Sequence, residues 1–248
     1  MGAYLRLSEL AADEFEQAGI QRSVNVQRRN IGIALVQLGS HAEAEQTFRK
    51  LLEQAAYMHV GTLGAEVEHW LGVALASMGS LAEAREVEAS SIAHAIAHGA
   101  RWIEARARAS LASILLASGD HEAAEREAET ATRVSPDSPA VRAHVLSALA
   151  EIRLRRGAPE DARALSADAL EVLSRVGGVE EGEALARLVH AEALEALGRR
   201  DEARAAIGEA RDRLLERAAK VADETLRQSM LRRVPVHART MALAETLA

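Results

Sequence analysis

Five short stretches of this 248-residue chain decide its fold: LGSHAEAE at 38–45, MGSLAEAR at 78–85, SGDHEAAE at 118–125, RGAPEDAR at 156–163 and LGRRDEAR at 197–204. Each stretch has Gly at its second position and Ala five residues after that Gly. Neighbouring glycines are 38 to 41 residues apart, at Gly39, Gly79, Gly119, Gly157 and Gly198. A fixed period of this size is the signature of a repeat protein.

Residues at fixed offsets before each glycine indicate a helix that ends there. A small residue stands seven positions before each glycine, at Gly32, Gly72, Ala112, Ala150 and Ala191. The residues four and eight positions before it are mostly apolar. Side chains three or four apart share a helix face, and the small residue lets a neighbouring helix approach closely. The Gly can end the helix in the left-handed conformation, and Ser40, Ser80 or Asp120 can then cap the next one.

A second break in the pattern stands 20 residues before each turn glycine, at Gly19, His59, Gly99, Asp137 and Gly178. Two breaks in each period predict two antiparallel helices in each unit. At 1.5 Å per residue, a helix of roughly 17 residues is about 25 Å long. The sequence therefore predicts an all-α chain of stacked helix pairs.

The pattern resembles the tetratricopeptide repeat family. The small residue, the turn Gly and the Ala after the turn stand at that family's spacing. Two departures are visible: most of the family's aromatic residues are replaced by Leu or Ala, with Phe48 surviving, and the period is near 40 rather than about 34. The chain is thus similar to the longer-helix variety found in bacterial signalling ATPases and kinases. The resemblance implies a right-handed α-α superhelix of about five helix pairs with capping helices at its ends.

The resemblance and the period together divide the chain. We expect a single solenoid over residues 1–248, starting with a helix of a partial repeat at 3–18 and ending with capping helices. The expected repeats cover 20–58, 61–98, 100–136, 138–177 and 179–219, and the capping helices cover 220–248. Because no first helix precedes 3–18, we expect the chain to be cut from a longer protein; the alternative is that this helix caps the solenoid.

The last segment of the chain departs from the repeats. It resembles the end of the C-terminal repeat regions of multidomain Ser/Thr kinases and signalling ATPases of myxobacteria. The matching residues are Val234, Pro235, Arg239, Thr240, Leu243 and Ala244. Pro235 predicts a helix boundary, because the residue before a proline is pushed out of the α region. The final helix can then close the open hydrophobic end of the stack.

Composition excludes several classes of function. The formal charge of −7 argues against nonspecific binding to a nucleic-acid backbone. The chain has no Cys, so it has no disulfide, thiolate metal site or catalytic thiol. It has no apolar run long enough to span a membrane, and its first residues lack the pattern of a secretory signal. We therefore expect a cytoplasmic protein with neither a nucleic-acid nor a membrane partner.

Motifs of catalysis are also missing from the sequence. There is no Walker loop, nucleophile elbow or HExxH motif. His94 and His98 share a predicted helix face, but no third metal ligand stands nearby in the sequence. Trp70 and Trp102 fit packing positions better than ligand-stacking platforms. We predict no enzymatic activity, no cofactor, no metal and no small-molecule substrate.

In proteins of this resemblance the first helix of each pair lines the concave side. The lining positions alternate between apolar side chains and polar groups of both signs, and Glu192 continues them in the fifth repeat. The predicted groove residues are Arg29, Val36, Gln37, Glu66, His69, Val73, Arg106, Ser113, Leu116, His144, Ser147, Glu151, Leu154 and Arg155. Such a mixture suits a protein segment or partner domain, so we predict a non-catalytic interaction and sensor scaffold of a larger bacterial signalling protein. The alternative is a receptor for a small signalling peptide.

Overall fold

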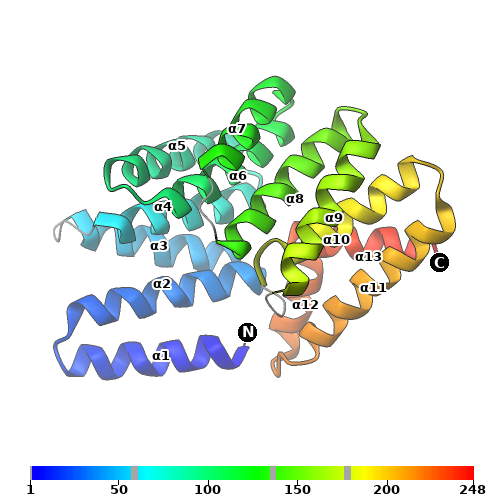
Figure 1. Cartoon of the computed structure of the whole chain (residues 1–248). Helices are drawn as coiled ribbons and strands as arrows, with labels where there is room; N and C mark the ends of the chain where they lie inside the picture. The colour runs from blue at the N-terminus through cyan, green and yellow to red at the C-terminus, as the bar shows by residue number, and fades with distance from the viewer. Residues whose placement is uncertain (1, 57–60, 135–137, 176–179) are drawn as a thin grey trace.

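The computed structural model describes residues 2–56, 61–134, 138–175 and 180–248, and over these residues the chain is all-α (Figure 1). The helices are α1 (Gly2–Gln17), α2 (Gln21–Gln37), α3 (His41–Ala56), α4 (Gly61–Ser77), α5 (Leu81–Ala97), α6 (Arg101–Ala117), α7 (His121–Val134), α8 (Pro139–Arg155), α9 (Pro159–Arg175), α10 (Glu180–Ala196), α11 (Arg200–Ala218), α12 (Glu224–Arg233) and α13 (Pro235–Thr246). The pairs α2/α3, α4/α5, α6/α7, α8/α9 and α10/α11 stack side by side, which confirms the predicted helical solenoid. None of the helices in the described ranges is long and apolar enough to cross a membrane.

The turn glycines end the first helices as predicted. All five have positive φ, between 74° and 86°, a conformation that only Gly adopts at low cost. At the first turn the Ser40 amide donates to the Leu35 carbonyl and the Gly39 amide to Val36, which satisfies two end carbonyls of α2. Among the second breaks, Gly19 and Gly99 also have positive φ. The other three predicted breaks, at His59, Asp137 and Gly178, lie outside the described residues.

One predicted cap is wrong. The Asp120 carboxylate accepts from the Ala123 amide at 3.1 Å and so caps the start of α7. The Ser80 side chain makes no capping hydrogen bond at the start of α5, where Ser80 has φ −78° and ψ 57°. Three other helices begin with proline, at Pro139, Pro159 and Pro235. Proline is tolerated there because the backbone N–H that it lacks would have no partner within the first turn of the helix.

The small residue seven positions before each turn glycine makes room for one side chain of the second helix. A Cβ built on Gly32 would lie 2.5 Å from Cζ of Phe48, and one built on Gly72 would lie 2.7 Å from the Glu88 carboxyl. Phe48 and Glu88 both stand nine residues after their turn glycine, and the same position holds Ala128, Ser166 and Ile207 in the later repeats. All five of these side chains are buried. Phe48 and Glu88 therefore require Gly at positions 32 and 72, whereas the equivalent positions of the later repeats hold Ala.

The C-terminal helices return to the beginning of the chain. Leu214, Ala218 and Met230 share one hydrophobic cluster with Leu5 and Leu38 from the first helices. In Figure 1 the N-terminus of α1 lies near α12. One polar contact and one close approach join α12 to the first turn: Nε2 of His41 lies 3.1 Å from the carbonyl of Arg233, and a Cβ built on Gly39 would lie 2.6 Å from the carbonyl oxygen of Ser229. The superhelix is thus bridged by its own last helices.

Candidate binding groove

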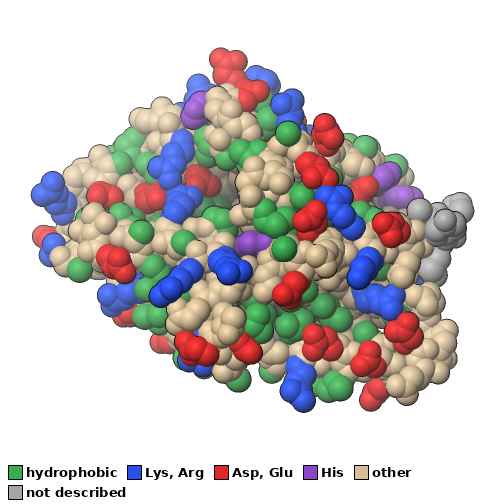
Figure 2. All heavy atoms as spheres, turned by 180° about the vertical axis from the view of Figure 1, so that it is seen from behind, with side chains coloured by type: hydrophobic (Ala, Val, Ile, Leu, Met, Phe, Trp, Pro, Cys, Tyr) green, Lys and Arg blue, Asp and Glu red, His purple; other side chains and the backbone are tan. Residues whose placement is uncertain are grey.

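A cavity of about 610 Å³ lies where the inner ends of the first helices meet α13. Its walls come from α4, α6 and α8 on one side and from Pro235 and Arg239 on the other. The lining is mainly apolar, with serine hydroxyls, two histidines and charged groups among the apolar side chains. Ligand sites in proteins are commonly of this size and composition. On the face shown in Figure 2, acidic and basic side chains are intermixed rather than gathered into patches of one sign.

The structure brings six of the fourteen predicted groove residues to this cavity: Val73, Ser113, Leu116, His144, Glu151 and Arg155. They come from three successive first helices, α4, α6 and α8. The other eight do not line the cavity, and they are Arg29, Val36, Gln37, Glu66, His69, Arg106, Ser147 and Leu154. Equivalent positions in the repeats therefore have different surroundings.

Three of these eight residues are fixed in the interior or against it. Val36 is buried in the same cluster as Leu38, and Leu154 packs against the cluster that contains Ala150. The Ser147 hydroxyl is buried and donates to the Ala143 carbonyl at 2.7 Å. Gln37 is half-buried at the end of α2.

Arg29 and Glu66 pair with each other between the first two repeats. Nη1 of Arg29 donates to Oε2 of Glu66 at 2.7 Å, and both side chains are largely shielded from water. Their charges therefore cross-link α2 and α4. A ligand would reach them only by competing with this ion pair.

His69 corrects the predicted groove, because its side chain is inside the protein. Only 1% of the side chain is exposed, and Nδ1 lies 3.2 Å from both carboxyl oxygens of Glu88, which is fully buried. Burial, followed by the charge of Arg106, lowers the pKa of His69 well below its usual value. Burial likewise raises the pKa of Glu88 well above its usual value. Both shifts favour the uncharged forms of the two side chains, which lie within hydrogen-bonding distance of each other.

Arg106 lies between two indole rings. Its guanidinium carbon is 5.1 Å from the ring centre of Trp70 and 5.6 Å from that of Trp102, within the range of a cation–π interaction. Trp70 is buried, whereas Trp102 is 38% exposed. The interpretation of both tryptophans as packing residues thus holds fully for Trp70 and only in part for Trp102.

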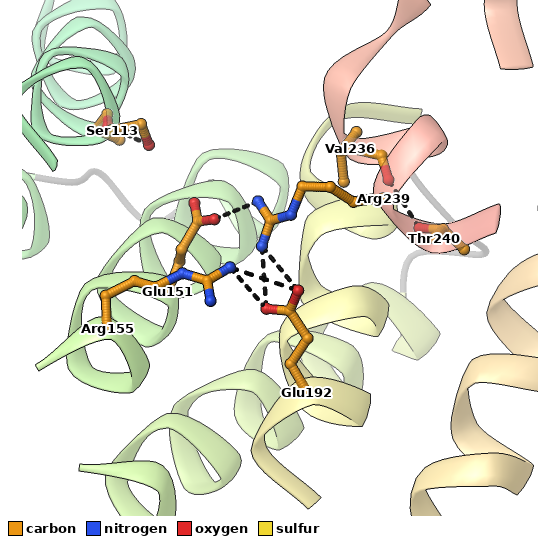
Figure 3. A network of polar contacts seen from close by, with 8 residues as sticks. Ser113, Glu151, Arg155, Glu192, Val236, Arg239 and Thr240 are labelled. Carbon is orange, nitrogen blue, oxygen red and sulfur yellow. Dashed lines mark hydrogen bonds and ion pairs between the residues drawn. The ribbon is translucent and has the colours of Figure 1, made fainter. Parts of the chain in front are cut away.

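Four charged side chains form a network at the edge of the cavity (Figure 3). Arg239 of α13 donates to Glu151 of α8 at 2.5 Å and to both oxygens of Glu192 of α10 at 3.0 Å. Arg155 donates to the same Glu192 carboxylate at 3.2 Å. Burial disfavours the charged form of Arg239, but Glu151 and Glu192 outweigh it and raise the pKa of its guanidinium. Two carboxylates and two guanidinium groups thereby compensate each other.

Several residues that line the cavity were not among the groove residues predicted from the sequence. Ser110 and Ile114 lie beside predicted positions on α6, and Leu81 and His121 begin the second helices α5 and α7. Arg239 was singled out in the terminal segment, but nothing in the sequence linked it to Glu151, 88 residues away. A contact between a unique terminal helix and a repeat leaves no periodic signal.

Comparisons with known proteins detect the repeat in two parts of the chain. The tetratricopeptide repeat model matches residues 30–57 and 105–138, which include the first and third turn glycines. These segments contain tetratricopeptide repeats. No curated protein matches the chain.

Several solved structures have the same fold. The Rap conjugation gene regulator of the plasmid pLS20, in complex with the Phr* peptide, has a TM-score of 0.64 and 15% identity, over 99% of this chain and 70% of that one. BtubC from P. vanneervenii has a TM-score of 0.62 and 16% identity, over 90% and 92% of the two chains. A Rap protein complexed with Competence and Sporulation Factor has a TM-score of 0.62 and 14% identity, over 98% and 71%. At these identities the likeness shows the fold.

Proposed function

We propose that this chain is a non-catalytic scaffold that holds a segment of another protein in the cavity on its concave side. The observation that carries the proposal is convergence: predicted groove residues from three successive repeats line one cavity of ligand-binding size. The mixture of apolar walls, hydroxyls and charged groups suits a polypeptide, which offers apolar side chains and backbone hydrogen-bonding groups together. The Rap conjugation gene regulator named above is in complex with a peptide, which supports a polypeptide ligand.

The proposal includes the wider context that the sequence predicted. The end of the chain, with Val234, Pro235 and Arg239, resembles the repeat regions of bacterial signalling kinases and ATPases. In this proposal the scaffold is the interaction region of a larger signalling protein of that kind. It acts by binding, and no residue is assigned to a chemical step.

The test is to fill the cavity. A library of random 12-residue peptides is selected on the parent chain, and the affinities of the selected peptides are measured for Ser113→Trp. Because Ser113 lines the cavity, the indole should exclude the peptides and raise their Kd at least tenfold, which corresponds to about 1.4 kcal/mol. Ser174→Trp is the matched control, since Ser174 is exposed on α9 and is not among the lining residues. Equal loss in both variants, or in neither, would refute binding in the cavity.

A receptor for a small signalling peptide is the second candidate. It is favoured by the boundary that Pro235 and Arg239 set at one side of the cavity, which makes the site finite rather than a continuous groove. Shortening the selected peptides separates the two functions. A small-peptide receptor should retain its affinity for a core of about five residues, whereas a scaffold for a longer segment should lose affinity stepwise.

A further inference from the structure

Helix α13 occupies part of the concave surface that the repeats would otherwise offer to a partner. Glu151 and Glu192 stand at the same repeat position, six residues before their turn glycines, and both belong to the predicted inner face. In the structure both carboxylates are engaged by Arg239 of the chain itself (Figure 3). The chain's own last helix is thus seated where the sequence predicted a foreign segment.

The seat on α8 and α10 requires a cation. The side chain of Glu151 is 10% exposed and that of Glu192 is 17% exposed, so neither carboxylate is well hydrated. A buried charge without a partner is unfavourable. Of the two carboxylates, Arg155 contacts that of Glu192, whereas Arg239 contacts both and so joins them.

The rest of α13 is held by a small area. Three of its residues are buried, His237, Thr240 and Ala244, against ten in α8. Near its C-terminal end, Arg204 donates to the carbonyl of Leu247 at 2.6 Å. Apolar contacts add to these polar ones, because Ala244 lies in a cluster with Ile207, and Val236 and Leu243 pack against that cluster.

Helix α12, in contrast, is anchored elsewhere. Its Ser229 and Arg233 meet the first turn of the solenoid, and Met230 lies in the large N-terminal cluster. A single residue, Val234, in extended conformation, separates α12 from α13. Rotation at Val234 can move α13 while α12 keeps its contacts with the first turn, once the buried hydrogen bond between Nδ1 of His237 and the carbonyl of Met230 has broken.

We propose that α13 is a displaceable, autoinhibitory occupant of the groove, held on α8 and α10 by Arg239. The inference rests on the proposed function, because the segment bound in the cavity reaches α8 and α10 only after it displaces α13. That segment must then present a cation, an arginine or lysine, to Glu151 and Glu192. Tethering gives α13 a high effective concentration at its seat, so an unaided peptide competes poorly with it.

The test uses the full chain and a fluorescein-labelled peptide of residues 234–248 as the probe. Arg239→Glu places a third carboxylate against Glu151 and Glu192, which should expel the tethered helix and leave the seat open. We expect the probe to bind Arg239→Glu at least tenfold more tightly than it binds the parent. Arg232→Glu makes the same change of charge on the exposed surface of α12 and should behave like the parent. A probe that itself carries Glu in place of Arg239 should not bind any of the three chains.

Hydrogen exchange measured on the same proteins provides the second measurement. In Arg239→Glu the amides of α13 should lose at least tenfold of their protection, while those of α11 keep theirs. If α13 keeps the parent's protection, or if the probe binds parent and variant equally, α13 is a fixed wall and the proposal is wrong. The probe is the chain's own helix, so this result is independent of foreign peptides. Failure of the Ser113→Trp test would overturn the proposed function without changing whether α13 is displaceable.

Discussion

The contact between Gly32 and Phe48 gives a sharp prediction about stability. In the variant Gly32→Ala the new Cβ would lie 2.5 Å from Cζ of Phe48. Ordinary contact begins at 3.4 Å, so the ring would have to retreat by roughly 0.9 Å, the difference between the two distances. Phe48 is fully buried, which leaves the ring little room for that movement. The substitution should therefore destabilise the fold.

Two opposing effects set the magnitude. Replacing Gly by Ala inside a helix stabilises by about 1 kcal/mol through helix propensity. Overpacking a well-filled core costs about 1–3 kcal/mol. Because the clash is with a rigid ring, we expect overpacking to win, with a net loss of about 1–2 kcal/mol and a fall in Tm of about 2–8 °C for a chain of this size.

The assay is urea unfolding followed by circular dichroism, with Tm measured by calorimetry. Gly208→Ala in α11 is the control, because a Cβ there meets nothing within 4 Å and only the gain in propensity should remain. Combining Gly32→Ala with Phe48→Leu should recover part of the loss, since the smaller side chain makes room for the methyl group. If Gly32→Ala is as stable as Gly208→Ala, the close approach of α2 and α3 at this point is wrong.

Two further predictions concern the buried carboxyl of Glu88 and the helix caps. Glu88→Gln should gain stability relative to the parent as the pH rises from 5 to 8. Burial raises the pKa of Glu88 in the folded chain. The protonated carboxyl therefore contributes stability to the parent below the unfolded pKa, and the parent loses this contribution as the pH rises toward the folded pKa. A difference between the two unfolding free energies that stays constant over this range would contradict the raised pKa of Glu88. Asp120→Ala should cost about 1 kcal/mol because it removes a cap, whereas Ser80→Ala should be nearly neutral, since that side chain makes no capping bond; equal Tm shifts would refute the assignment.

The predicted fold is confirmed because its determinants are local and repeated. Gly39 and the four equivalent glycines fix where each first helix ends, and Pro235 fixes the boundary between α12 and α13. Each such signal depends on residues within one turn of chain, so a sequence displays it directly. The error at Ser80 is of another kind: the residue type allowed a cap, but the local conformation did not use it.

The site was only partly predictable, because the same repeat position meets different neighbours. Ten residues before the turn, Arg29 pairs with Glu66, whereas His69 is buried against Glu88. That difference follows from the residue nine positions after the turn. Phe48 packs an apolar ring against Gly32, but Glu88 places a carboxyl against Gly72, and a buried carboxyl needs a polar partner. His69 supplies that partner and leaves the groove as a result. A periodic pattern therefore indicates which residues share a helix face, and the exceptions within the pattern determine which of them remain available to a ligand.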